Sequence, residues 1–161
     1  MIDSWLYTLD KCQYGDIIMQ LAQVENILGG EKTLGKKLIS KMDLVDLGSM
    51  GVTKRAVSNL ANYLSLSSKQ IADLLPVTER TLHRYSSRQH FNQSVSEQVI
   101  HIAEVLAKGI EIFQEKTKLL LWLNTPHKVF SGNTPFSLLK SRFGTELVLE
   151  ELSRIEFGIY S

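Results

Sequence analysis

Apolar residues recur at the three- and four-residue spacing of an amphipathic helix along almost the whole chain. The clearest sets are Ile17, Leu21, Val24 and Leu28; Val57, Leu60 and Leu64; Val95, Val99, Ile102 and Leu106; and Val148, Leu152 and Ile155. No stretch sustains the alternation of a half-buried strand. The pattern therefore predicts an all-α chain of about nine short helices.

Capping residues predict where some of these helices begin and end. Ser94 and Glu97 have the spacing of a capping box. Thr134-Pro135 places a capping residue before a first-turn proline. Gly144 and Gly158 stand where two helices are expected to end.

Two short helices are predicted within residues 64–87, which read LSLSSKQIADLLPVTERTLHRYSS. Ser67 and Gln70 form a capping box for the first helix. That helix must stop just before Pro76, because proline lacks the backbone donor and pushes the preceding residue toward an extended conformation. Thr78 can cap the second helix. A turn of about four residues between two such helices is typical of a helix-turn-helix.

The two faces of this helical pair differ in chemistry. The residues expected to face inward are Ile71, Ala72, Leu75, Val77, Leu82 and Tyr85, and those on the outer face are Thr78, Glu79, Arg80, His83, Arg84 and Ser87. Arginine guanidinium groups beside short hydrogen-bonding side chains suit base edges and phosphates in a major groove. The alternative is a solvated face on an ordinary helical hairpin, and Pro76 occupies a turn that carries glycine in many helix-turn-helix motifs.

The charge of the chain favours the first of these interpretations. The net charge is only +1, but residues 53–90 carry six bases and two acids, a local surplus of +4. Residues 1–52 sum to −2, and residues 109–161 are neutral. The positive surplus therefore coincides with the predicted helix-turn-helix.

Several other classes of protein find little support in the residues. Cys12 is the only cysteine, so no disulfide within the chain and no cysteine-pair metal site can form. The longest uninterrupted apolar run, residues 119–123, is far shorter than a membrane span, and the first residues do not have the order of a signal peptide. We therefore expect a cytoplasmic protein with no membrane partner.

Catalytic motifs are also weak. Residues 30–36, GEKTLGK, have most of the spacing of a phosphate-binding loop, but Lys37 replaces the hydroxyl that such a loop needs, and a helix is predicted where a strand should precede it. The four histidines lack metal-ligand spacing. We expect no enzymatic activity, no metal and no cofactor.

A family resemblance covers about residues 26–160. The stretch RTLHR lies between ILGGEKTLGKKLISKMDLVDLGSMGVTKRAVSNLANYLSLSSKQIADLLPVTE and LLLWLNTPHKVFSGNTPFSLLKSRFGTELVLEELSRIEFGIYS. In the second half, WLNTP, FSGNTPFSLL, a turn at Gly144 and LSRIEFG follow the order and spacing of the family. The chain thus resembles the Xre-type antitoxins of Xre–RES toxin-antitoxin pairs, within the wider Xre/MbcA/ParS group.

The resemblance implies the antitoxin of a type II system, with a Xre-like helix-turn-helix DNA-binding half followed by a small helical toxin-binding half. It implies a RES-domain toxin that degrades NAD, an antitoxin segment that covers the toxin's active site, and a complex that represses its own promoter at operator DNA. We divide the chain into an N-terminal helical segment (1–50), a DNA-binding domain (51–108) and a toxin-binding domain (109–161).

Site residues are carried over on the matching positions. The outer face and the resemblance together predict DNA contacts by Thr78, Arg80, Thr81, His83 and Arg84 in the groove and by Ser67, Lys69 and Arg88 at phosphates. The predicted toxin contacts are Phe130, Gly132, Asn133, Arg142, Glu156, Tyr160 and Ser161. Trp122, Leu123, Phe136 and Leu139 are expected in the core, because aromatic and leucine residues at helical spacing usually pack inward.

A second function stays open at this point. A stand-alone dimeric helix-turn-helix transcription regulator would share the DNA-binding half without needing a toxin. Both interpretations predict a homodimer, because two helix-turn-helix units on a palindrome bind half-sites about one turn, roughly 34–36 Å, apart.

Overall fold

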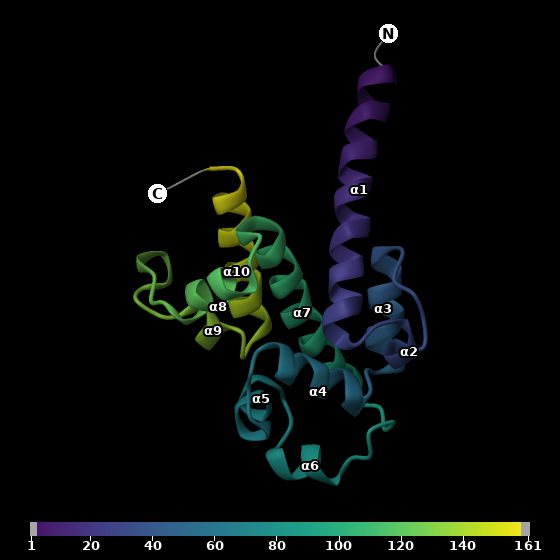
Figure 1. Ribbon diagram of the computed structural model, residues 1–161, viewed down its shortest axis with the longest axis vertical. Helices are drawn as coiled ribbons and strands as arrows, with labels where there is room; N and C mark the ends of the chain where they lie inside the picture. The colour runs from purple at the N-terminus through teal and green to yellow at the C-terminus, as the bar shows by residue number, and fades with distance from the viewer. Residues whose placement is uncertain (1–2, 159–161) are drawn as a thin grey trace.

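The computed structural model describes the backbone of residues 3–158 and the side chains of residues 15–158. Over that range the chain is helical and contains no strand (Figure 1). The elements are α1 (Asp3–Leu28), α2 (Glu31–Leu34), α3 (Lys41–Met50), α4 (Lys54–Tyr63), α5 (Ser68–Leu74), α6 (Glu79–Arg84), α7 (Gln93–Phe113), α8 (Lys116–Asn124), η1 (Lys128–Phe130), α9 (Pro135–Leu138) and α10 (Arg142–Glu156). The all-α prediction is confirmed, although α1 and α7 are long rather than short.

Helix α7 forms the centre of the molecule. It packs against α1, α3 and α4 and also against α8 and α10, and Figure 1 shows it between α1 and the C-terminal helices. Val99, Ile102, Ala103 and Leu106 on α7 are completely buried. A helix with neighbours on several sides needs such an extended apolar surface. The predicted boundary after residue 108 falls inside this helix, so the three-part division stays a prediction.

Helix α1 extends well beyond the other helices at its N-terminal end, as Figure 1 shows. Its C-terminal half packs on α7 and α4. The side chains of Leu21, Val24 and Leu28 are buried there, as their helical spacing predicts.

Most of the predicted caps are confirmed. Ser67 and Gln70 form the capping box of α5, and Leu75, just before Pro76, is extended with φ −115° and ψ 152°. Thr78 caps α6 through the backbone N–H of Thr81. The Thr134-Pro135 pair opens α9, and α10 ends two residues before Gly158, whose φ is 66°.

Two predicted helix ends are wrong. Asn92, not Ser94, caps α7, and its side chain accepts from the N–H of Val95. Gly144 lies in the first turn of α10 instead of ending a helix, and the Ser141 hydroxyl accepts from its N–H at 3.1 Å. A Cβ at Gly144 would lie only 2.0 Å from the Leu138 carbonyl oxygen. Glycine is needed here for the close approach of two backbones, a requirement that sequence spacing does not distinguish from a helix end.

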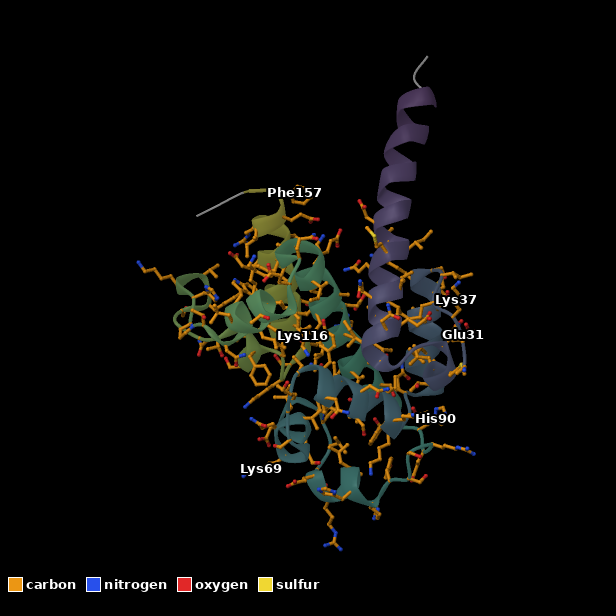
Figure 2. The ribbon with its side chains drawn as sticks, in the orientation of Figure 1. Glu31, Lys37, Lys69, His90, Lys116 and Phe157 are labelled. Atoms are coloured by element: carbon orange, nitrogen blue, oxygen red, sulfur yellow. The ribbon has the colours of Figure 1, made fainter. Side chains whose placement is uncertain are left out.

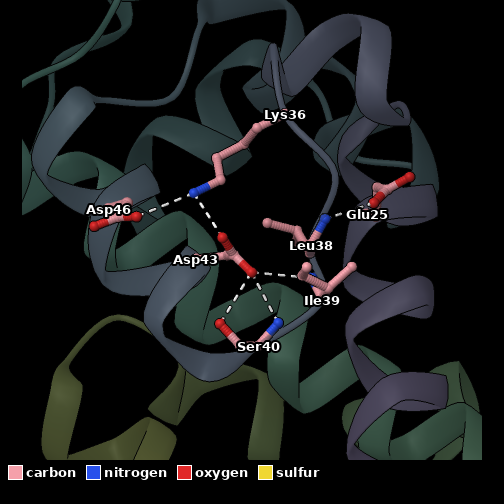
Figure 3. A network of polar contacts seen from close by, with 7 residues as sticks. All are labelled: Glu25, Lys36, Leu38, Ile39, Ser40, Asp43 and Asp46. Atoms are coloured by element: carbon pink, nitrogen blue, oxygen red, sulfur yellow. Dashed lines mark hydrogen bonds and ion pairs between the residues drawn. The ribbon is translucent and has the colours of Figure 1, made fainter.

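The stretch that resembles a phosphate-binding loop folds into α2 and the segment that leads to α3. Lys36 binds Asp43 at 2.7 Å and Asp46 at 3.1 Å (Figure 3). Asp43 also accepts hydrogen bonds from the N–H groups of Ile39 and Ser40 at the start of α3. The Lys36 ammonium group and these donors hold the pKa of Asp43 well below its usual range. The lysine that would contact phosphate is thus part of the α2–α3 connection.

The described residues offer neither a membrane span nor a metal site. No helix among them is long and apolar enough to cross a membrane. They also contain no group of three or more His, Cys, Asp or Glu side chains placed to hold a metal ion.

Candidate functional site

Helices α5 and α6 pack on each other through the side chains that the sequence predicts. Ile71, Ala72, Leu75 and Leu82 are buried, and Val77 and Tyr85 are half-buried against the core. Leu74 is also buried, at 1% exposure, although it was not among the predicted contacts. The hairpin places α6 at the end of the molecule farthest from the start of α1 (Figure 1).

The outer face of α6 is polar and accessible. Thr78, Arg80, His83 and Arg84 are exposed, whereas Thr81 is half-buried. Thr78 uses its hydroxyl twice within the cap, because Oγ1 accepts from the Thr81 N–H and lies 2.9 Å from the Thr81 hydroxyl. His83 Nε2 lies 3.5 Å from a Glu79 carboxylate oxygen. Arg80 and Arg84 are therefore the strongest hydrogen-bond donors on this face that take no part in capping α6.

Cations dominate the surface around α5 and α6. Lys69, Arg80, Arg84 and Arg88 are exposed, and none forms an ion pair with the side chains that the structure describes. Ser67 is exposed beside Lys69 and also serves as the cap of α5. The predicted DNA contacts thus share one end of the molecule, and an anionic backbone could meet several of them at once.

The turn that carries three predicted toxin contacts is built around Phe130. Its ring is only 8% exposed, and it packs edge-on against His127, which in turn lies over Trp122. The Phe130 ring therefore lies mostly inside the fold, but it also lines a groove beside α10, so its role as a toxin contact stays a prediction. Gly132 and Asn133 are exposed, and the Asn133 side chain donates to the Phe130 carbonyl at 2.9 Å. Gly132 has a φ of 82°, a left-handed conformation that glycine adopts without strain.

The other predicted toxin contacts lie at opposite ends of α10. Arg142 is exposed and binds Glu146 one turn later, with an Nε–Oε1 distance of 3.0 Å. Glu156 binds Lys108 of α7 at 2.6 Å, so it joins two helices inside the molecule. These ends are about 21 Å apart by the rise of a helix, so they do not form one cluster. Tyr160 and Ser161 lie outside the described residues.

Sequence reasoning missed an apolar surface on α10. Val148 and Leu152 are completely buried, but Phe143 is 80% exposed and Leu147, one turn later, is 50% exposed. Phe157 just after the helix is 74% exposed. The signal was available, because α10 has more apolar positions than one buried face can hold. Figure 2 shows Phe157 at the opposite end of the molecule from Lys69.

A groove of about 310 Å³ lies between α10 and the turn after η1. Its walls include Val129, Leu138 and Leu147, with Glu150 and Arg154 on the α10 side. We refer to Val129, Phe143 and Leu147, together with this groove, as the α10 face. Contiguous exposed apolar side chains of this kind mark sites of protein association.

Two protein families match successive segments of the chain. Residues 43–104 match the antitoxin Xre-like helix-turn-helix domain, and residues 108–158 match the antitoxin Xre/MbcA/ParS C-terminal toxin-binding domain. The chain belongs to the Xre/MbcA/ParS group of antitoxins. The resemblance predicted from the sequence is confirmed, and this protein is the antitoxin of a toxin-antitoxin system with a helix-turn-helix domain.

The antitoxin is similar to a curated protein and to a chain of a solved structure. It is 26% identical to Antitoxin Xre of Yersinia enterocolitica over 120 residues. The aligned residues cover 73% of this chain and 81% of the relative. It is also similar to a chain in the crystal structure of the M. tuberculosis MbcT–MbcA toxin-antitoxin complex. That similarity has 18% identity and a TM-score of 0.48, and it covers 65% of this chain and 94% of the other.

Proposed function

We propose that this antitoxin neutralises a RES-domain toxin that degrades NAD, by laying its C-terminal part over the toxin's active site. The observation that supports this most strongly is the α10 face, because it exposes apolar side chains within the segment that matches a toxin-binding domain. The RES class of the toxin rests on the sequence resemblance. The antitoxin acts by binding, without catalysis and without a cofactor.

The α10 face supplies the affinity for the toxin in this proposal. Full burial of a Phe or Leu side chain contributes about 1.5–3 kcal/mol, and Phe143 and Leu147 are both available for it. Gly132, Asn133 and Arg142 form the polar rim. Tyr160 and Ser161, which lie outside the described residues, are proposed as further toxin contacts.

The helix-turn-helix represses the antitoxin's own operon in the same proposal. Arg80 and Arg84 contact base edges, supported by Thr78, Thr81 and His83. Ser67, Lys69 and Arg88 contact phosphates, which give affinity and register but no sequence preference. A homodimer places two such units on half-sites about 34–36 Å apart.

One experiment tests the neutralisation directly. The reading frame beside the antitoxin gene is expressed in bacteria alone or together with the full antitoxin chain, and growth and cellular NAD are measured. The toxin alone should deplete NAD and stop growth, and the antitoxin should restore both. Growth arrest with normal NAD would contradict only the proposed chemistry of the toxin. Arrest that the antitoxin does not relieve would contradict its pairing with that toxin and would favour a stand-alone regulator.

A further inference from the structure

Lys54 contributes to the positive surplus of the helix-turn-helix, yet its charge is directed inward. It opens α4, and its Nζ donates to the carbonyl oxygen of Tyr85 at 2.8 Å, 31 residues along the chain. Tyr85 is the C-cap of α6. The last carbonyl groups of a helix lack partners within the helix and carry its negative dipole end, so an ammonium group suits this place.

The segment after α6 is fastened to the start of α4 at several further points. We call residues 85–91 the strap. The N–H of Lys54 donates to the Gln89 carbonyl at 2.9 Å, and the N–H of Arg55 donates to the Ser87 carbonyl at 3.0 Å. Lys54 therefore binds the strap through its main chain and its side chain, at two places.

The far end of the strap is equally well held. The N–H of Phe91 donates to the Val52 carbonyl at 2.9 Å, and the Phe91 ring stacks on Tyr85 with centroids 4.8 Å apart. Gly51 has a φ of 88°, and a Cβ there would lie 2.3 Å from the Phe91 carbonyl oxygen. This end needs no contribution from the Lys54 side chain.

Helix α6 packs on α5 and has few other tertiary contacts of its own. It is only six residues long, and Leu82 is its one buried side chain. Helices this short are unstable without tertiary contacts. At its N-terminal end Thr78 provides a local cap, whereas at its C-terminal end the Lys54 ammonium group ties the helix to α4. The Lys54–Tyr85 hydrogen bond is therefore one of the few contacts that set the direction in which Arg80 and Arg84 point.

We propose that Lys54 is a positioning residue for DNA recognition, which acts through the Tyr85 carbonyl to orient α6 and not by contact with DNA. This inference rests on the proposed operator binding. It separates Lys54 from Lys69, which is an exposed lysine on α5 and a proposed phosphate contact. The two lysines carry the same charge, so they form a matched pair for experiment.

The test compares Lys54→Met with Lys69→Met in the full chain. Dissociation constants are measured for DNA from upstream of the antitoxin gene and for unrelated DNA of the same length, at two salt concentrations. Lys54→Met should weaken operator binding about tenfold, the scale of one charged hydrogen bond, and leave unrelated DNA nearly unchanged. Lys69→Met should weaken both DNAs by a similar factor and reduce the salt slope by about one.

Three further measurements keep the outcomes distinct. Lys54→Arg, which keeps a cationic donor, should retain most of the operator preference. Toxin neutralisation and the melting temperature report whether Lys54→Met still folds. The positioning role would be overturned if Lys54→Met lost equal affinity for both DNAs. It would also be overturned if this variant lost toxin neutralisation and had a lower melting temperature. A wild-type chain that shows no preference for the operator would instead contradict the proposed DNA binding itself.

Discussion

The arginines of the two matched domains are in opposite situations. Arg80, Arg84 and Arg88 in the helix-turn-helix form no ion pair with the described side chains, whereas Arg142 and Arg154 on α10 each bind a glutamate of the same helix. No exposed large apolar side chain lies within α4 to α6, although Val45 and Met50 on α3 are exposed. The surface of α5 and α6 thus offers positive charge that is not neutralised by an ion pair with the described side chains, and the α10 face offers apolar area.

This difference indicates which kind of partner each surface suits. A polyanion is attracted by cations that keep their full charge, and release of its counterions drives the binding. A folded protein gains most from burial of apolar area, while charges at the rim that are already paired add little. Both surfaces belong to one scaffold, since α7 packs on α4 and on α10.

The largest expected effect comes from removing the apolar side chains of the α10 face. The double variant Phe143→Ser, Leu147→Ser should weaken toxin binding at least about thirtyfold, because burial of the parts of these two side chains that are still exposed contributes about 2–4 kcal/mol. Titration calorimetry with purified toxin measures this loss. Operator binding should stay within about twofold of the wild type, since the side chains proposed to contact DNA do not change.

Met42→Ser is the matched control, because Met42 is 64% exposed but lies on α3. It should bind toxin normally. If it weakens toxin binding as much as the α10 variant does, the contrast between the two regions is wrong and the toxin covers a different surface.

The next largest effect is expected at the unpaired arginines. Arg80→Ala and Arg84→Ala should each weaken operator binding by about 1–3 kcal/mol, the value of a bidentate base contact. Neutralisation should survive in both. A gel-shift titration on operator DNA, with the growth assay beside it, separates the two activities.

Arg142→Ala provides the comparison for a paired arginine. Its charge is already balanced by Glu146, so operator binding should not change, and toxin binding should change only slightly. Operator binding that is normal in both Arg80→Ala and Arg84→Ala would remove α6 as the recognition helix.

The smallest effect is expected at Asp43, away from both surfaces. Its pKa is lowered in the folded chain, mainly by Lys36, so its contribution to stability is present above the unfolded pKa of about 3.9 and is lost as the pH falls below it. Asp43→Asn should lower the melting temperature at pH 7, and the difference from the wild type should shrink below about pH 4. Thermal unfolding followed by circular dichroism checks this. An undiminished difference at low pH would show that the charge of Asp43 is not the cause.

Local rules account for the parts of the site that sequence reasoning predicted correctly. The cap at Ser67, the stop at Pro76 and the cap at Thr78 each depend on residues within four positions of one another. Such contacts form in the same way wherever the segment lies. Ser94 shows the limit of these rules, because Asn92 two residues earlier is an equally good cap and the chain uses it.

The placement of Phe130 could not be predicted in this way. A phenylalanine in a turn can point outward to a partner or inward to the core, and here the Phe130 ring lies mostly inside, edge-on against His127. Gly144 was misplaced for a related reason, since its tight contact is with the Leu138 backbone in a preceding segment.

The amino-acid sequence was sufficient for the all-α class, the location of the helix-turn-helix and the basic character of that region, because periodicity, caps and charge are properties of neighbouring residues. It could not show which apolar positions of α10 remain exposed, that Glu156 is bound to Lys108, or that Lys54 holds the end of α6. Each of these depends on which helices pack together across tens of residues. Burial and pairing are set by that packing, and a side chain left without a neighbour inside the fold stays available to a partner.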